Sequence, residues 1–308
     1  MQILDLRHPN TPYPLEACGL VLGNFDGVHR GHRALIDELK RLKAARHESV
    51  PLGAFCFTEP PSKYFGRPIP QLTSNAEKME LLRREGLQFI ILCDFAEVVD
   101  LSPEEFVVRI LMCECGCKFA VCGYNYSFGK NAAGTPADLV RLLGGEDGSA
   151  VSVVPAVTDG RRAISSSVIR AMLEGGHPED ATRLLGYPYT LRGEVQGGKQ
   201  MGRALGFPTA NLIFPEGALI PHHGVYAVTL RLGKRQYCGI ANVGVRPTFD
   251  DGEHVTCEVF LLGFEGNLYG KSVAVSFLHF LREEREFDSP EQLRAQIARD
   301  VTAATEYF

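Results

Sequence analysis

The chain has 308 residues, which is long for one hydrophobic core and comfortable for two domains. Hydrophobic residues make up 45% and charged residues 22% of it, as in ordinary globular proteins. The net charge of −5 argues against a surface that coats nucleic acid, so any phosphate-binding region must be a local site.

Targeting signals and cysteines set the expected compartment. Residues 1–14 lack the basic and apolar regions of a secretory signal, and no apolar run approaches the roughly 18 residues of a membrane span. Nine cysteines, an odd number spread over both halves, favour reduced thiols over a disulfide framework. The cluster of Cys113, Cys115 and Cys117 lacks Cys-x-x-Cys spacing, so we interpret it as small buried thiols and not as a metal site. We expect a cytoplasmic protein with no membrane or nucleic-acid partner.

The first half alternates strand-like and helix-like segments. This alternation predicts a doubly wound, Rossmann-like α/β domain with a parallel sheet. The strand-like runs are Cys18–Leu22, Leu52–Phe57, Phe89–Cys93, Phe119–Cys122 and Val151–Val154.

A glycine-rich loop with two histidines follows the first of these runs, between Gly23 and His32. Leu35, Leu39 and Leu42 then recur at helical spacing, so a helix begins within the loop and continues to about residue 47. Unpaired backbone N–H groups at a helix start favour bound phosphate. His29 and His32 are three residues apart and can face one phosphate. No Gly-Lys-Ser/Thr follows, so the loop is not a P-loop, and no third ligand for zinc lies nearby.

Three other helix starts are marked by a capping residue followed by proline. They are Ser102-Pro103, Thr135-Pro136 and Ser289-Pro290, each with an acid or amide at the third helical position. The last one opens a C-terminal helix, in which Leu293, Ile297 and Val301 form an apolar stripe. We expect this helix to cover one face or end of the second domain.

The second half changes to short, glycine-rich, β-like segments. Their close succession predicts a β-barrel. The segments are Tyr189–Val195, Gly224–Leu232, Gln236–Val243, Val255–Leu262 and Ser272–Phe280. The change of texture at Gly186-Tyr187-Pro188 predicts a domain boundary, with domains at residues 1–186 and 187–308.

Four motifs together carry a family resemblance. The run from Gly23 to His32 resembles the signature of nucleotidyltransferases that transfer AMP or CMP. With the three other motifs, in this order, nearly the whole chain resembles the prokaryotic bifunctional riboflavin kinase/FAD synthetase family. Those motifs are Gly123-Tyr124-Asn125-Tyr126-Ser127-Phe128-Gly129, Ile164-Ser165-Ser166-Ser167-Val168-Ile169-Arg170 and Gly202-Arg203-Ala204-Leu205-Gly206-Phe207-Pro208-Thr209-Ala210-Asn211.

The resemblance implies two ATP-dependent activities. The barrel would phosphorylate riboflavin to FMN, and the α/β domain would adenylylate FMN to FAD and release pyrophosphate. Magnesium is the implied metal in both domains. The oligomeric state cannot be inferred from the sequence.

In the α/β domain, the resemblance assigns His29 and His32 to catalysis. Loops at the carboxyl ends of the strands should bring the motifs to one crevice. The implied ATP- and phosphate-binding residues are Gly23, Phe25, Asp26, Gly27, His29, His32, Asn125, Arg162, Ser165, Ser166 and Arg170.

One position departs from the family pattern. The family usually carries Pro-His-Pro after the second strand, where this chain has Glu59-Pro60-Pro61. Because this histidine is missing, the resemblance does not establish the flavin-side or phosphate-side contact of this loop. It also leaves the adenylyl transfer step as an open question.

In the barrel, the resemblance implies Glu258 as the base that deprotonates the riboflavin hydroxyl, although an alternating strand alone would suggest a solvated glutamate. Thr209 and Asn211 are the implied metal ligands, and hydroxyl and amide oxygens suit Mg²⁺. The implied flavin contacts are Asn242, Arg246 and Arg282. The implied ATP- and phosphate-binding residues are Gly198, Lys199, Gly202, Arg203, Pro208, Thr209 and Asn211.

Three other hypotheses remain open. The chain could be a riboflavin kinase with a degenerate α/β domain, or a flavin or nucleotide sensor without turnover. The α/β domain alone would also suit a cytidylyltransferase or a pantetheine-type adenylyltransferase, but neither explains the barrel.

Overall fold

The computed structural model describes residues 1–308 except 7–15, 146, 197–206, 208 and 249–251; between 245 and 254 it describes only the backbone of the remaining residues. The chain divides into two compact units, Met1–Ser165 and Ser166–Phe308. Each unit is described by itself below.

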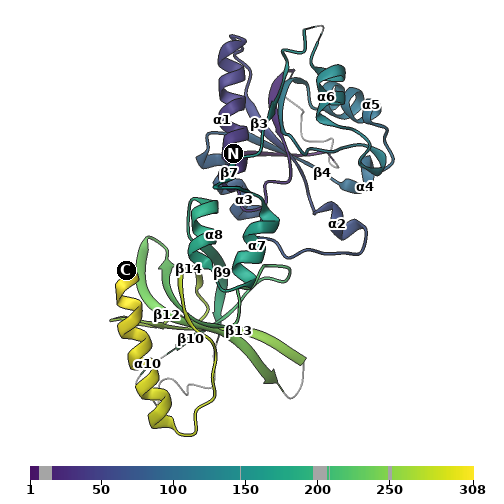
Figure 1. Ribbon diagram of the computed structural model, residues 1–308. Coiled ribbons are helices and arrows are strands. Elements are labelled where there is room, and N and C mark those ends of the chain that lie inside the picture. The colour runs from purple at the N-terminus through teal and green to yellow at the C-terminus, as the bar shows by residue number, and fades with distance from the viewer. Residues whose placement is uncertain (7–15, 146, 197–206, 208, 249–251) are drawn as a thin grey trace. The chain divides into compact units, whose positions relative to one another are not determined.

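The first unit contains a six-stranded parallel sheet in the order β1-β4-β3-β2-β5-β6 (Figure 1). The predicted strands are all present, with β5 longer than expected, and β1 at the edge was missed. A separate two-stranded ribbon is formed by β7 and β8. The strands are β1 Gln2–Asp5, β2 Cys18–Leu22, β3 Leu52–Phe57, β4 Phe89–Cys93, β5 Cys117–Gly123, β6 Val151–Val154, β7 Thr158–Asp159 and β8 Arg162–Ala163.

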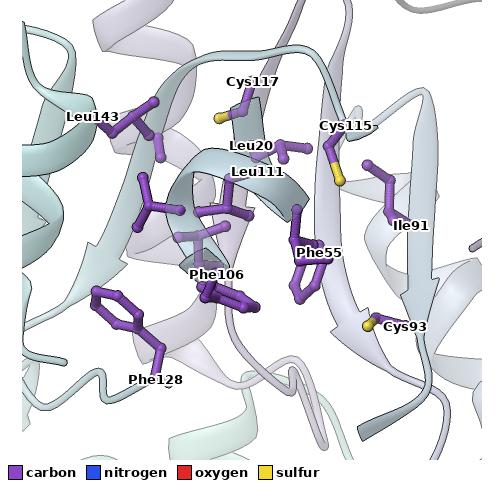
Figure 2. Close-up of a cluster of buried hydrophobic side chains, with 14 of the residues drawn as sticks. Leu20, Phe55, Ile91, Cys93, Phe106, Leu111, Cys115, Cys117, Phe128 and Leu143 are labelled. Carbon is purple, nitrogen blue, oxygen red and sulfur yellow. The ribbon is translucent and has the colours of Figure 1, made fainter. Parts of the chain in front are cut away.

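Helices cover both faces of this sheet, which confirms the doubly wound architecture. Alternate residues of each strand point to opposite faces, so Leu20 and Phe55 belong to one core and Val21 and Ala54 to the other. Figure 2 shows the first core, to which Phe106 and Leu143 belong together with the buried thiols of Cys93, Cys115 and Cys117. The helices are α1 Arg30–Ala45, α2 Pro61–Tyr64, α3 Asn75–Arg84, α4 Phe95–Val98, α5 Pro103–Glu105, the π-helical η1 Phe106–Glu114, the 3₁₀ turn η2 Lys130–Ala132 and α6 Pro136–Leu143.

The predicted caps are confirmed. Ser102 and Thr135 each form a reciprocal capping box with the acid three residues later, and Ser289 accepts a hydrogen bond from the backbone N–H of Gln292. A capping box satisfies two helix N–H groups that would otherwise lack partners.

The second unit contains a closed six-stranded antiparallel barrel in the order β10-β13-β12-β11-β14-β9. Five strands lie where the sequence predicted them, and β10 was recognised only as a motif. The strands are β9 Tyr189–Gln196, β10 Thr209–Ile213, β11 Gly224–Leu232, β12 Arg235–Thr248, β13 Gly252–Leu261 and β14 Ser272–Arg282.

In the described part of the second unit, the helical elements are α7 Ser166–Glu174, α8 Pro178–Leu185, α10 Pro290–Ala304 and the 3₁₀ turn η3 Thr305–Tyr307. Ile297 and Val301 of α10 pack against Ala227 and Ile240 of the barrel, so the C-terminal helix covers a barrel face as expected. Helices α7 and α8 group with the barrel because α8 packs on β9 and β14, and the backbone N–H of His222 donates to Leu173 O at 2.9 Å. The boundary at residue 186 stays a prediction.

The thiols are mostly buried. Cys18, Cys56, Cys93, Cys115, Cys117, Cys122 and Cys257 are buried, and only Cys113 is exposed. Burial raises the pKa of Cys56, Cys93 and Cys122 to about 12. The described residues contain no group of three or more candidate metal ligands among His, Cys, Asp and Glu. Among the helices that the structure describes, none is long and apolar enough to cross a membrane.

Candidate active sites

The loop from Gly23 to His32, called the phosphate loop below, joins β2 to α1. His29 is the N-cap of α1, and its Nδ1 accepts a hydrogen bond from the backbone N–H of His32 at 3.3 Å. The first-turn N–H groups of a 16-residue helix therefore lie at the carboxyl edge of the sheet. The sequence predicted this junction, because Leu35, Leu39 and Leu42 are the buried face of α1.

The backbone of the phosphate loop is strained. Phe25 and Val28 have positive φ angles of 51° and 34°, and Gly27 has φ of 81°. Positive φ in a β-branched or aromatic residue costs about 1–3 kcal/mol and persists only where the surroundings hold it. Phe25 and Val28 are both completely buried in the core beneath α1, so packing supplies part of that support.

The Asp26 carboxylate also holds the loop in place, through hydrogen bonds to a segment far away in sequence. Its carboxylate, 2% exposed, accepts hydrogen bonds from the backbone N–H groups of Leu72 and Thr73, both at 3.1 Å. Thr73 Oγ1 donates to Asp26 Oδ1 at 3.4 Å and accepts from the Gly27 N–H at 3.0 Å. We call these contacts the Asp26–Thr73 clamp. In the structure, the Asp26 carboxylate bonds other parts of the fold. The predicted contact of Asp26 with the nucleotide stays a prediction.

The two histidines lie face to face. Their ring centroids are 3.7 Å apart with an interplanar angle of 15°. Burial, followed by the positive charges of His29 and Lys78, holds the pKa of His32 well below its usual 6.5. His32 is therefore neutral at pH 7 and can donate a hydrogen bond from one ring nitrogen. His32 Nδ1 and Asn24 Oδ1 are buried without a hydrogen-bond partner among the described residues.

The space around Gly31 explains why a glycine lies between the two histidines. A Cβ at this position would lie 3.1 Å from the His29 ring and 3.6 Å from the Ile164 carbonyl oxygen. The glycine therefore lets the His29 ring fold over the start of α1. It also lets the chain just before Ser165 come near, which brings the beginning of the third motif to the phosphate loop.

The other predicted residues of this site occupy varied positions. Asn125 is exposed just after β5, and Arg162 is exposed in β8. Ser165 ends the first unit, whereas Ser166 and Arg170 lie in the first turns of α7 in the second. Gly23 lies under the Phe25 ring. Their contacts with a nucleotide stay predictions.

An aromatic cluster at the same edge of the sheet was missed. Phe57 ends β3 and Phe95 follows β4, with ring centroids 5.2 Å apart. Tyr64 and Phe65, which are 53% and 61% exposed, lie 5.5 and 5.7 Å from Phe95. Carboxyl ends of parallel strands meet at one edge, so this cluster shares the edge with the phosphate loop. The aromatic residues that follow Glu59-Pro60-Pro61 in the sequence were the signal from which this cluster could have been predicted.

The barrel places its predicted polar residues in one row. Strand register sets Asn211 of β10 opposite Glu258 of β13, and Glu258 opposite Asn242 of β12. Thr209 lies two residues before Asn211 on the same face, and its Oγ1 is 3.4 Å from Glu258 Oε2. The neighbouring row, Leu212, Cys257 and Val243, is completely buried. The polar row therefore lies on the outer face of the barrel.

A cavity of about 500 Å³ opens beside this row. Thr209 and Ala210 form one wall, Val195, Val259 and Leu261 line the barrel side, and the loop from Phe264 to Tyr269 closes over them. The lining is mostly apolar with a few polar groups, as in sites for small planar ligands.

The segment after β14 lies against the barrel and α10. Asn242 Nδ2 donates to Glu284 Oε1 at 2.8 Å, and a Cβ on Gly244 would overlap the Glu284 carboxylate. Arg282 makes hydrogen bonds of 2.8–3.2 Å to the buried carboxylate of Asp300 on α10. Its predicted flavin contact stays a prediction. Gly198, Lys199, Gly202, Arg203 and Pro208, and the side chain of Arg246, lie outside the described residues.

The donor set of the polar row suits a hard divalent cation. Thr209 and Asn211 offer a hydroxyl and an amide oxygen, and Asn211 Oδ1 is buried without a hydrogen-bond partner in the described part of the chain. Oxygen ligands completed by phosphates and water are the preferred environment of Mg²⁺, and enzymes that transfer phosphoryl groups from ATP use such a cation.

Comparisons with known proteins match both halves. Residues 12–168 match the family model described as FAD synthetase, and residues 185–308 match the model described as riboflavin kinase. The bifunctional riboflavin kinase/FMN adenylyltransferase of Listeria monocytogenes is 33% identical, with 100% of this chain and 98% of that protein covered. The protein of the same name from Escherichia coli K12 is 34% identical over the same shares.

The chain belongs to the bifunctional riboflavin kinase/FMN adenylyltransferase family. This membership makes it a transferase of flavin biosynthesis, as the motifs indicated. A solved structure has the same fold over its full length: a Streptococcus pneumoniae protein named macrolide-efflux protein, with a TM-score of 0.90, 32% identity and 100% coverage of both chains.

Proposed function

We propose that this chain makes FAD from riboflavin in two ATP-dependent steps at two separate sites, the polar row of the barrel and the phosphate loop of the first unit. The observation that carries this proposal is that each unit has its own phosphate-type site with its own polar groups.

In the first step, the riboflavin 5′-hydroxyl oxygen attacks the γ-phosphorus of ATP. The bond from that phosphorus to the β–γ bridging oxygen breaks, and ADP leaves. Glu258 accepts the hydroxyl proton. Its position between Asn211 and Asn242, on the outer face of the barrel, is suitable for this role. The cavity beside Thr209 takes the nucleoside of ATP.

Thr209 and Asn211 would hold Mg²⁺, the divalent cation that their oxygens suit best. When bound, the cation neutralises charge on the phosphates of ATP. Glu258 is proposed to accept the hydroxyl proton and not to act as a metal ligand.

In the second step, a phosphate oxygen of FMN attacks the α-phosphorus of ATP. The bond to the α–β bridging oxygen breaks and pyrophosphate leaves, so no covalent enzyme intermediate is needed. The reaction depends on positioning and on stabilising charge at the departing oxygen. The first-turn N–H groups of α1, His29 and His32 supply such donors, with Asn125, Arg162 and Ser165 as further proposed phosphate contacts.

The aromatic cluster of Phe57, Tyr64, Phe65 and Phe95 supports a flavin site in the first unit. Aromatic rings bind flat apolar ring systems by stacking and edge contacts. Three members of the cluster, Phe57, Tyr64 and Phe65, flank Glu59-Pro60-Pro61 in the chain. Pro60 precedes α2, and Glu59 pairs with Lys63 at 3.2 Å. We propose that these rings contact the isoalloxazine of FMN and offset the missing histidine. A cytoplasmic location is part of the proposal.

The test is to separate the flavins formed when purified protein is incubated with riboflavin, ATP and Mg²⁺. FMN that rises and then gives way to FAD is the expected result. FMN without FAD would show that the first unit is inactive. Riboflavin binding without any ADP would favour the sensor hypothesis.

A further inference from the structure

Lys78 is a buried lysine that neither proposed step has used. It lies in the first turn of α3, where its backbone N–H donates to Ser74 O at 2.9 Å, and its side chain is only 4% exposed. In the described part of the chain, no carboxylate lies within ion-pair distance of its ammonium. Lysine side chains are seldom this buried unless they are paired, so a bound anion is a suitable partner for Lys78.

The Asp26–Thr73 clamp fixes α3 against the phosphate loop. Leu72 and Thr73, which donate to Asp26, immediately precede the α3 cap residue Ser74. The first turn of α3 therefore follows directly from a segment that is bonded to the phosphate loop at three donor groups. This arrangement places the start of α3, which carries Lys78, next to the phosphate loop.

Electrostatics agree with this placement. The positive charge of Lys78 contributes to the lowered pKa of His32 in α1, and at Cys56 in β3 it opposes the rise in pKa that burial causes. Lys78 is therefore close enough to act electrostatically on His32 in α1 and on Cys56 near the end of β3.

We propose that Lys78 is a phosphate-binding residue of the adenylyl-transfer site, whose ammonium pairs with the triphosphate of ATP and with the charge on the departing pyrophosphate. This inference rests on the adenylyl transfer proposed above. A bound polyphosphate would supply the anion that the described fold does not provide. The Asp26–Thr73 clamp would then position both the phosphate loop and the helix that carries Lys78.

The test compares Lys78→Met with Arg83→Met, an exposed residue of the same helix that pairs with Glu80. Loss of a charge-assisted phosphate contact should weaken ATP binding to the first unit about ten-fold or more and lower FAD formation at least as much. FMN formation should be unchanged in both variants. Lys78→Arg should recover part of the ATP affinity, because the positive charge remains.

A second measurement uses the unmodified sequence. The ammonium signal of Lys78 in protein labelled with ¹⁵N-lysine, assigned by its absence in Lys78→Arg, should shift when ATP is added. A signal that does not move, or FAD formation by Lys78→Met equal to that by Arg83→Met, would overturn the inference. Wild-type protein that makes FMN but no FAD would instead overturn the proposed second step, while the ATP-dependent shift would still report on Lys78.

Discussion

The phosphate loop and the polar row of the barrel hold their side chains by different means. The loop contains positive φ angles at Phe25 and Val28, and a carboxylate that bonds residues 46 and 47 positions away keeps it in place. The row needs no such device, because strand register alone sets Asn211, Glu258 and Asn242 side by side. A site on a strained loop depends on remote residues, whereas a site on paired strands depends mainly on its own.

The largest effect is expected in the barrel. Glu258→Gln keeps the size of the side chain but removes the base, so kcat for FMN formation should fall by about 10²–10⁴-fold. ATP affinity should change little, because the variant retains Thr209 and Asn211. Kinetics with riboflavin as the varied substrate measure this, with exposed Glu306→Gln as the control. An unchanged kcat would remove Glu258 from the role of base.

The next effect separates the two sites. His32→Ala removes a hydrogen-bond donor from the phosphate loop, so FAD formation should fall by roughly 10²–10³-fold while FMN formation is retained. The control is His47→Asn, since His47 has φ of 53° and asparagine tolerates that conformation. Equal loss of both activities would contradict the separation of the sites.

The clamp gives a smaller effect, mainly on stability. Asp26→Asn places an amide against N–H donors, and the free energy of unfolding of the first unit should fall by about 1.5–3 kcal/mol. Thr73→Val should act in the same direction through loss of the Gly27 contact. Denaturant titration measures both, and Asp37→Asn on the exposed side of α1 is the matched control. Variants as stable as the control would show that the loop does not need the clamp.

The smallest expected effect is pH-dependent. Because the pKa of His32 is lower in the folded protein than in the unfolded chain, the unfolded state binds more protons below about pH 6.5. Stability should therefore be full above that pH and fall on acidification, by at most about 1.4 kcal/mol per pH unit. His32→Gln should show a shallower decline. Equal slopes for the two proteins would argue that His32 does not contribute.

Much of the fold could be predicted from local patterns. The parallel strands were visible as apolar runs, the caps of three helices as short motifs, and the barrel as closely spaced β-like segments. Strand β1 was missed because it is only four residues long and two of its residues are exposed. Strand β10 was missed because its first residues, Thr209-Ala210-Asn211, were interpreted as part of a motif and not as a strand.

The sites were predicted less completely. The motifs pointed to His29, His32, Thr209, Asn211 and Glu258, and the structure brings the last three together. The aromatic cluster was not predicted, because Phe57 and Phe95 belong to different strand ends and no local pattern joins them. The partners of Arg282 and Asn242 were equally invisible, since Asp300 and Glu284 contact them only through folding.

The sequence by itself determined the two-domain class, the strand–loop–helix junction at His29 and the alternation that exposes one face of β13, because these depend on residues close together in the chain. The tertiary structure alone decided that Asp26 bonds Thr73, that the buried Lys78 acts electrostatically on His32, and that Asn211, Glu258 and Asn242 form one row. These contacts join residues dozens of positions apart, and only the packing of α3 and the register of the barrel bring them together.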